Sequence, residues 1–157
     1  MRIAIASDEA TELTTFLIKD LQARGHTPIP IGPLAPDDPD VDWPLTAGRA
    51  AQLVASGEAD EGLVCCWTGT GACIAANKVR GIRAALCGDA ETARGARIWN
   101  HANVLALSLR ATSIPIAKEI LDAWFNTPID QGEAQSEWNL RQIERVRQLE
   151  AKENLPG

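Results

Sequence analysis

The sequence has few basic residues and almost no histidine. Its 157 residues include 15 Lys and Arg against 21 Asp and Glu, which gives a formal net charge of −6, and only two His. Nucleic acid and anionic membranes both need a basic face on the protein, so we expect neither as a partner. The four cysteines form no C-x-x-C pair, and with so few histidines they argue against a zinc site. We expect no bound metal or cofactor.

Long apolar runs are also absent. The N-terminal run Arg2–Ala6 is followed at once by Ser7, Asp8 and Glu9, so it is too short for a signal peptide or a membrane span. We therefore expect a cytoplasmic protein whose thiols stay reduced. The length, with 45% hydrophobic and 23% charged residues, is typical of one soluble globular domain spanning residues 1–157.

Short apolar runs alternate with stretches of helical periodicity. This alternation predicts βαβ units with right-handed crossovers and a parallel sheet covered on both faces. We expect an α/β fold with a doubly wound, five-stranded sheet of order 2-1-3-4-5 in residues 1–127. The predicted strands are 2–6, 27–31, 61–66, 83–87 and 104–107, and the predicted helices are 11–24, 45–56, 70–79, 90–99 and 114–125.

A long polar helix is predicted after this domain, at 131–152. It has one narrow apolar stripe, formed by Leu140, Ile143, Val146 and Leu149. Such a stripe on a polar helix favours packing against another subunit, in a homodimer or homotetramer, and we expect this to be a dimerisation helix. Packing back on its own domain is the alternative.

The predicted corner between the third strand and the next helix reads Cys66-Trp67-Thr68-Gly69-Thr70-Gly71. Backbone amides in such a turn, with the helix N-terminus behind them, favour an anion. Gly-x-Gly alone is a weak signal, because a tight turn needs it too. No Lys-Ser/Thr pair follows, which excludes a Walker A loop, and no third glycine completes a dinucleotide-binding fingerprint.

Cys66 is the candidate for chemistry at this corner. A thiol there lies in the field of the following helix, which favours its thiolate form. A thiolate beside an oxyanion-binding turn can remove a proton next to a carbonyl, or attack the carbonyl. Thr68 can pass a proton to the developing oxyanion; inert packing is the alternative for both. Cys65 should point to the opposite side of the sheet.

Longer motifs resemble a known family. The stretches DEGLVCCWTGTGACIAANKVRGIRAALC and ARIWNHANVLALSLR are similar to the ribose-5-phosphate isomerase B family, which includes the galactose-6-phosphate isomerase subunits. The strongest motif is C-x-T-G-x-G-x-x-I-A-A-N-K from Cys66 to Lys78, and IAIASDEA, VDWP, ASGEADEG and ILDAW also match. The resemblance implies a five-stranded doubly wound fold, a dimer or tetramer with sites at the dimer interface, and aldose–ketose interconversion through an enediolate without metal.

The resemblance also implies roles for individual residues. Cys66 takes the place of the base, Thr68 that of the residue that protonates the oxyanion, and the Gly69–Gly71 amides, Thr70 included, hold that oxyanion. Asn100 matches an Asn that contacts sugar hydroxyls across the interface. The other expected substrate contacts are Asp8 in the first loop and Arg110 near the phosphate.

Several positions depart from the family pattern. The family usually has a His where this chain has Glu9 and a Gly where it has Trp67. It often has a ring-opening His where this chain has Trp99. The two Arg that clamp phosphate in the last helix of the family align with Gln135 and Asn139. The loss of these cations weakens a phosphate clamp, because each charge-assisted hydrogen bond contributes about 1.5–3 kcal/mol. The cations that remain are Arg110 and Arg141.

Ring opening and the tryptophans leave alternatives open. His101 can replace the ring-opening residue, since imidazole titrates near neutral pH, or it can be an exposed loop histidine. Trp67 and Trp99 can narrow the pocket or stack on a sugar, or pack in a core or interface. We therefore expect an isomerase of altered specificity acting on a small sugar. The alternatives are epimerisation, a complementing subunit of a hetero-oligomer, and a small-molecule binding protein.

Overall fold

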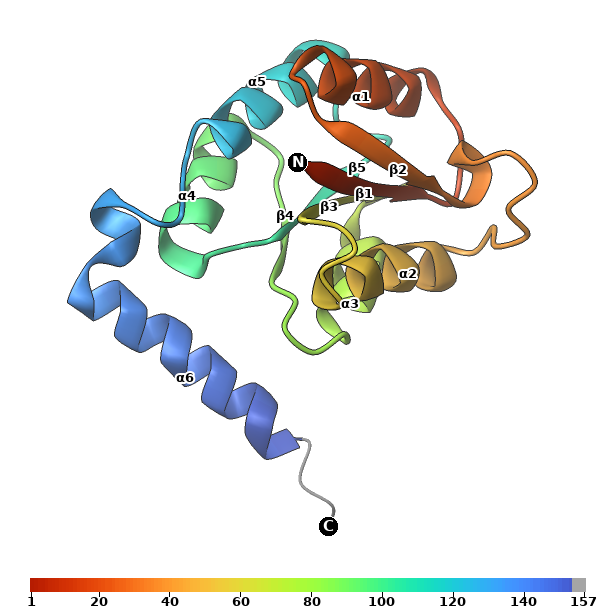
Figure 1. Cartoon of the computed structure of the whole chain (residues 1–157). Helices are drawn as coiled ribbons and strands as arrows, with labels where there is room; N and C mark the ends of the chain where they lie inside the picture. Colours follow the sequence, from red (N-terminus) through yellow and green to blue (C-terminus); the bar gives the residue numbers. More distant parts are fainter. Residues whose placement is uncertain (154–157) are drawn as a thin grey trace.

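Five parallel strands form the centre of the fold (Figure 1). The computed structural model describes residues 1–153. The strands are β1 (Arg2–Ser7), β2 (Thr27–Ile31), β3 (Glu61–Cys66), β4 (Ala84–Leu86) and β5 (Val104–Ser108). The helices are α1 (Glu12–Ala23), α2 (Trp43–Ala55), α3 (Thr70–Asn77), α4 (Ala90–Asn100), α5 (Ile114–Phe125) and α6 (Glu137–Glu153), with short 3-10 turns η1 (Gly32–Leu34) and η2 (Gly132–Gln135).

The predicted α/β doubly wound fold is confirmed, but the predicted strand order is wrong. The order is β2-β1-β3-β5-β4, so β5 lies between β3 and β4. The physical reason is burial: all five residues of β5 are buried, whereas β4 has three residues and its Leu86 is exposed. A strand that is buried along its whole length takes an interior position because both of its faces are covered.

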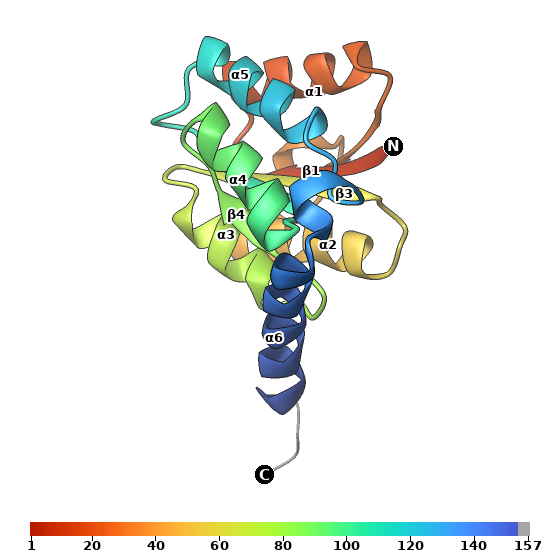
Figure 2. The ribbon, with the colours of Figure 1, turned by 90° about the vertical axis from the view of Figure 1, so that its left-hand side faces the viewer.

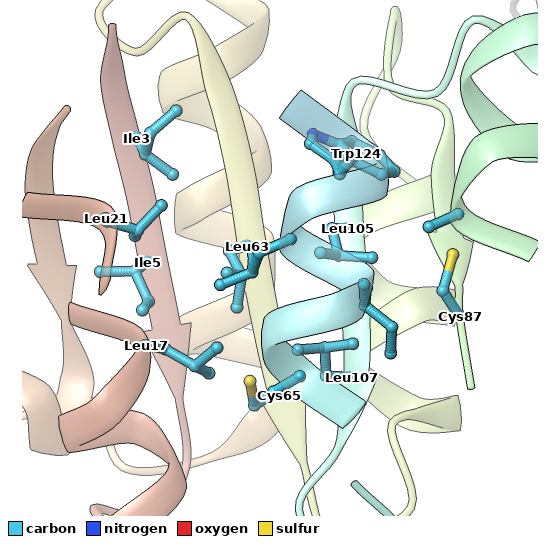
Figure 3. Close-up of a cluster of buried hydrophobic side chains, with 14 of the residues drawn as sticks. Ile3, Ile5, Leu17, Leu21, Leu63, Cys65, Cys87, Leu105, Leu107 and Trp124 are labelled. Carbon is cyan, nitrogen blue, oxygen red and sulfur yellow. The ribbon is translucent and has the colours of Figure 1, made fainter. Parts of the chain in front are cut away.

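The two faces of the sheet carry different helices and different cores. On one face, α1, α4 and α5 cover large aliphatic side chains such as Ile5, Leu63 and Leu107 (Figures 1 and 3). On the other face, α2 and α3 pack through small residues, mostly alanine. Small side chains let these two helices approach the sheet closely, so the polypeptide around the end of β3 is tightly packed.

Local signals explain where several helices begin. Thr11 caps α1 through a reciprocal pair of hydrogen bonds with Thr14, and Asp89 accepts from the Thr92 amide at the start of α4. These are preferred N-cap residues. Helix α2 begins at Trp43, two residues before the predicted start, because Pro44 suits the first helical turn.

A buried ion pair lies at the amino edge of the sheet, the edge at which the strands begin. Arg97 on α4 contacts the Glu61 carboxylate at 2.8 Å and donates to the Ala102 and Thr127 carbonyls. The second carboxylate oxygen of Glu61 accepts from the indole of Trp124 on α5 at 2.6 Å. Both charges are therefore paired and hydrogen-bonded, as buried charges must be.

Helix α6 projects from the α/β domain (Figures 1 and 2), but Glu150 near its end accepts from the Gly81 amide at 2.6 Å. It begins at Glu137, after the 3-10 turn η2, and not at residue 131 as predicted. Of its apolar stripe only Ile143 is buried, whereas Leu140, Val146 and Leu149 are exposed. No helix within residues 1–153 is both long and apolar enough to cross a membrane.

Candidate active site

The corner between β3 and α3 lies at the carboxyl edge of the sheet, where the strands end. Gly69 caps α3 with a φ of 76°, in the left-handed region. A Cβ at this position would lie 2.6 Å from the Leu86 side chain and 2.9 Å from the backbone carbon of Leu107. Both the dihedral angle and the space therefore require glycine here.

Cys66 is the last residue of β3, and its side chain is buried on the face that α2 and α3 cover. Its Sγ accepts from the Ala72 amide at 3.4 Å, within the first turn of α3. The thiol thus contacts the positive end of the helix, as the sequence predicts. Cys65 packs in the opposite core, where burial raises the pKa of its thiol.

The side chains that follow Cys66 are exposed. The Thr68 and Thr70 hydroxyl oxygens lie 2.7 Å apart. The Trp67 side chain is 59% exposed, so it is not a core residue of this chain. Two hydroxyls and an indole are therefore exposed at this corner, and Thr68 also lines the cavity that opens there.

Asp8 lies next to this corner, because β1 pairs with β3 and Ser7 is opposite Cys65. Its Oδ1 is buried and has no hydrogen-bond partner within the described residues. Desolvation raises the pKa of the Asp8 carboxyl, and the charges of Glu9 and Asp42 raise it further. A buried acceptor without a donor is costly, so this oxygen is suited to a ligand hydroxyl.

Arg110 reaches the same edge from β5. Its backbone amide donates to the Trp67 carbonyl at 3.0 Å, so its position follows from β5 lying beside β3. A cavity of about 540 Å³ opens between the ends of β3, β4 and β5. It is lined by Thr68, Leu86, Cys87, Gly88, Ser108, Arg110, Ala111 and Thr112.

Trp43 is a site residue that the sequence interpretation missed. A Cβ on Gly71 would lie 3.0–3.2 Å from three ring carbons of Trp43, so the indole covers this glycine. The Trp43 side chain is 41% exposed and comes from the first turn of α2. The only signal was its place in the VDWP motif, which carried part of the family resemblance.

Three predicted site residues lie elsewhere in this chain. Trp99, Asn100 and His101 end helix α4 and precede β5, so they belong to the amino edge of the sheet. The five residues of β5 separate them from the Cys66 corner by roughly 16 Å at about 3.3 Å per residue. The structure therefore divides the predicted site residues into two groups.

His101 is buried, so the alternative of an exposed loop histidine is wrong. It ends α4 in the left-handed conformation, with a φ of 48°. Its Nε2 donates to the Ala134 carbonyl in η2 at 2.8 Å. The imidazole thus connects α4 to the turn that precedes α6.

Asn139 and Gln135 have structural partners. Asn139 is fully buried, and its side-chain amide donates to the Ile98 and Ala134 carbonyls. Its Oδ1 is, after that of Asp8, the second buried side-chain oxygen in residues 1–153 without a hydrogen-bond partner. Gln135 donates to the Ile129 carbonyl. Trp99 and Trp138 beside them form an exposed, edge-to-face pair with ring centroids 6.4 Å apart.

Metal ligands do not gather at either group. Within the described part of the chain, no cluster of three or more His, Cys, Asp or Glu is placed to hold a metal ion. The groups that can act at the Cys66 corner are thus a thiol, two hydroxyls, backbone amides, the Asp8 carboxyl and Arg110.

Comparison with known proteins gives consistent matches. The family model described as Ribose/Galactose Isomerase matches residues 3–143. The galactose-6-phosphate isomerase subunit LacB of Clostridium acetobutylicum is 44% identical over 125 residues, which are 79% of this chain and 71% of that protein. The D-erythrulose-4-phosphate isomerase of Pectobacterium atrosepticum is 37% identical over 133 residues, 84% of this chain and 87% of the relative. The solved structure of ribose-5-phosphate isomerase B of Clostridium thermocellum superposes on this chain with a TM-score of 0.86 at 35% identity. The superposition covers 98% of this chain and 100% of the other chain.

The fold and the site define a doubly wound α/β protein with a thiol at the point where the strand order reverses, between β1 and β3. The chain belongs to the ribose/galactose isomerase family. The resemblance drawn from the Cys66–Lys78 motif is therefore confirmed.

Proposed function

We propose that this protein is an aldose–ketose isomerase that acts on a small sugar through an enediolate. The observation that supports this most directly is the contact of the Cys66 thiol with the α3 N-terminus, beside the unpartnered Asp8 carboxylate oxygen. The named relatives isomerise three different sugar phosphates, which supports the reaction type more strongly than any one substrate.

The proposed chemistry is a proton transfer between neighbouring carbons. Cys66, as thiolate, removes the proton from the carbon next to the carbonyl; the C–H bond breaks and an S–H bond forms. The electron pair moves to the carbonyl oxygen, where Thr68 and the amides of Gly69–Gly71 stabilise the charge. Return of the proton from the Cys66 thiol to the former carbonyl carbon, with transfer of the hydroxyl proton from the second oxygen to the first, gives the isomer and restores the thiolate. The same enediolate also permits epimerisation. The Asp8 carboxylate accepts a hydrogen bond from a sugar hydroxyl.

We propose that the phosphate clamp is weak and the substrate specificity altered. Glu9 and Asp42 add negative charge around Asp8, and a phosphate dianion close to them is repelled. Asn139 is occupied by backbone carbonyls, which fits a segment that no longer binds phosphate. Arg110 lines the cavity and Arg141 is paired with Glu137 at 2.8 Å. One or two cations suit a monoanion or a neutral sugar better than a dianion.

We propose a homodimer or homotetramer in which a second copy completes the site. Leu140, Val146 and Leu149 of the α6 stripe and the Trp99–Trp138 pair support this, because they are exposed and apolar groups gain stability when a partner covers them. Asn100, and Trp99 with it, then reach the partner's Cys66 corner. His101 is better suited to anchoring η2 than to opening a sugar ring, since its imidazole is buried against Ala134.

A complementing subunit is the second candidate. It is favoured by one observation: the Cys66 corner and the Asn100 group lie at opposite edges of the chain, so each site depends on two subunits. In that case a different chain supplies the missing cations. A sensing or binding protein that has lost turnover is the third candidate.

Isotope exchange tests the proposal. The purified protein is incubated in deuterated water with phosphorylated and free aldoses and ketoses. We expect deuterium at the carbon next to the carbonyl, and none with Cys66→Ala. Cys73→Ala, which changes a half-buried thiol outside the corner, should keep the exchange. Exchange that survives in Cys66→Ala contradicts the assignment, and no exchange with any sugar favours a binding or complementing role.

The clamp is tested separately with ribose 5-phosphate. We expect a KM well above that for the unphosphorylated or monoanionic sugars that exchange, and a decrease of about tenfold in Glu9→His, since one favourable charge-assisted contact replaces a repulsive one. An ordinary KM for ribose 5-phosphate in the native protein would show that the clamp is intact.

A further inference from the structure

We propose that Ser108 is a positioning residue that holds Arg110 and the Cys66 corner in one rigid unit. This inference rests on the proposed function. Ser108 is the last residue of β5 and is opposite Cys66 in the sheet. Leu105 and Leu107 face the opposite core, so the alternation along β5 turns Ser108 to the face on which Cys66 lies.

The Ser108 hydroxyl makes two hydrogen bonds that connect separate parts of the site. It donates to the Trp67 carbonyl at 3.0 Å and accepts from the Ala111 amide at 3.1 Å. The same Trp67 carbonyl accepts from the Arg110 amide at 3.0 Å. The Trp67 carbonyl therefore accepts two hydrogen bonds, one from the Ser108 hydroxyl and one from the backbone amide of Arg110, whose side chain carries the cation.

The backbone around Ser108 also sets the shape of the corner. A Cβ on Gly69 would lie 2.9 Å from the Ser108 nitrogen, so the turn of the corner packs directly on the end of β5. The Thr112 amide donates to the Ser108 carbonyl at 3.2 Å. Ser108 is thus fixed on both sides, and a shift of its side chain shifts Trp67 and Arg110 together.

Packing alone does not account for serine at this position. Alanine would fill nearly the same volume, and the neighbouring inward residue of β5, Ala106, is fully buried. Without the hydroxyl, the Ala111 amide loses its acceptor and the Trp67 carbonyl loses one of two donors. Displacements of about 1 Å at a reactive centre can change rates by up to about 100-fold, so this loss should affect chemistry more than folding.

The test compares Ser108→Ala with Ser113→Ala. Ser113 caps α5 by accepting from the Ile116 amide, so its loss removes one hydrogen bond of a nearby serine without changing the partners of Trp67 or Ala111, and it serves as a matched control. We expect Ser108→Ala to lower kcat for the exchange reaction by about 10- to 100-fold, with a smaller change in KM. Ser113→Ala should leave both unchanged, and Ser108→Thr, which keeps the hydroxyl, should recover most of the rate.

A second readout needs no substrate. The rate of Cys66 alkylation by iodoacetamide, followed by peptide mass spectrometry, should change at least about threefold in Ser108→Ala because the thiol responds to its surroundings. It should stay near the native rate in Ser113→Ala. If no sugar exchanges but the alkylation rate changes, the proposed function fails and the positioning role stands. If alkylation and kcat in Ser108→Ala both match the control at equal melting temperature, Ser108 has no positioning role.

Discussion

The buried Glu61–Arg97 pair and the polar groups of the Cys66 corner differ in how far the chain itself satisfies them. At the amino edge, the Glu61 carboxylate and the Arg97 guanidinium are buried, and each is satisfied within the chain. At the carboxyl edge, the Asp8 carboxylate has a buried oxygen with no partner among residues 1–153, and the Thr68 hydroxyl contacts that of Thr70.

The tryptophans that adjoin these groups differ in the same way, although Trp99 and Trp138, beside Asn100, are exposed as well. Trp124 at the amino edge is buried and its indole donates to Glu61. Trp43 and Trp67 at the carboxyl edge are exposed. A satisfied buried network rigidifies a fold, whereas unsatisfied groups and exposed aromatic rings are suited to a ligand or a partner. The Glu61–Arg97 network is thus suited to stability and the Cys66 corner to binding, and the predictions below test this division.

The largest expected effect is at the amino edge. Arg97→Met leaves the buried Glu61 charge without its partner, which should lower the free energy of unfolding by about 3–5 kcal/mol. Arg94→Met on the same helix is the matched control, because Arg94 pairs with Glu91 on the exposed surface and should cost less than about 1 kcal/mol. Urea unfolding measures both, and equal losses would contradict a structural role for the amino edge.

The next effect is at the turn of the carboxyl edge. Gly69→Ala introduces a Cβ into the Leu107 backbone at positive φ, so it should cost about 2–4 kcal/mol. Gly81→Ala is the control, because its φ is also positive but nothing lies within 4 Å of its Cβ; strain alone should cost about 1–2 kcal/mol. Urea unfolding of both variants separates crowding from strain, and a cost at Gly69 no larger than at Gly81 would remove the crowding argument.

A smaller effect on stability is expected for Asp8→Asn. The folded-state pKa of Asp8 is raised, so the native protein loses stability relative to the variant as the pH rises from the ordinary Asp pKa of about 3.9 through the higher folded-state pKa. At neutral pH the variant should equal or exceed the native stability by less than about 1 kcal/mol. Isotope exchange should fall about 10- to 100-fold, because the sugar loses a charged acceptor. A variant less stable than the native protein would show that the carboxylate is structural.

The smallest effect is local. The backbone amide of Gly32 holds the pKa of the Asp38 carboxyl below its ordinary value, with further contributions from the Asp40 amide and Arg49. A depressed pKa means that this contribution to stability is present above a pH of about 3.9 and is lost as the pH falls below it. Hydrogen exchange at the Gly32 amide, corrected for the intrinsic rate, should therefore accelerate in acid. In Asp38→Asn we expect no such acid-dependent step, and a step that persists would place the titrating group elsewhere.

Much of the fold could be predicted from the sequence, because periodicity and turn residues act locally. The doubly wound parallel sheet followed from alternating strand and helix patterns, and the Cys66 corner from one contiguous motif. The predicted strand order was wrong because the pairing of β5 with β3 depends on which strand is buried on both faces. The predicted beginning of α6 was wrong because the preceding residues form η2. This turn depends on a hydrogen bond from His101, more than 30 residues earlier in the sequence, to the Ala134 carbonyl.

The candidate site divides in the same way. Cys66, Thr68, Gly69 and Gly71 were found together because they are neighbours in the chain. Trp43 and Ser108 were not found, since each reaches the corner only through tertiary packing. The separation of Asn100 from Cys66 also needed the structure, because a parallel sheet places the two ends of a strand at opposite edges.

The sequence by itself determined the family, the fold class and the groups present at the corner, all of which depend on short-range patterns of residue type. The tertiary structure decided which strands adjoin Cys66, which polar groups are satisfied and which remain open to a ligand. The reason is physical: backbone preference acts over a few residues, whereas burial and hydrogen-bond satisfaction depend on groups that only the folded chain brings together.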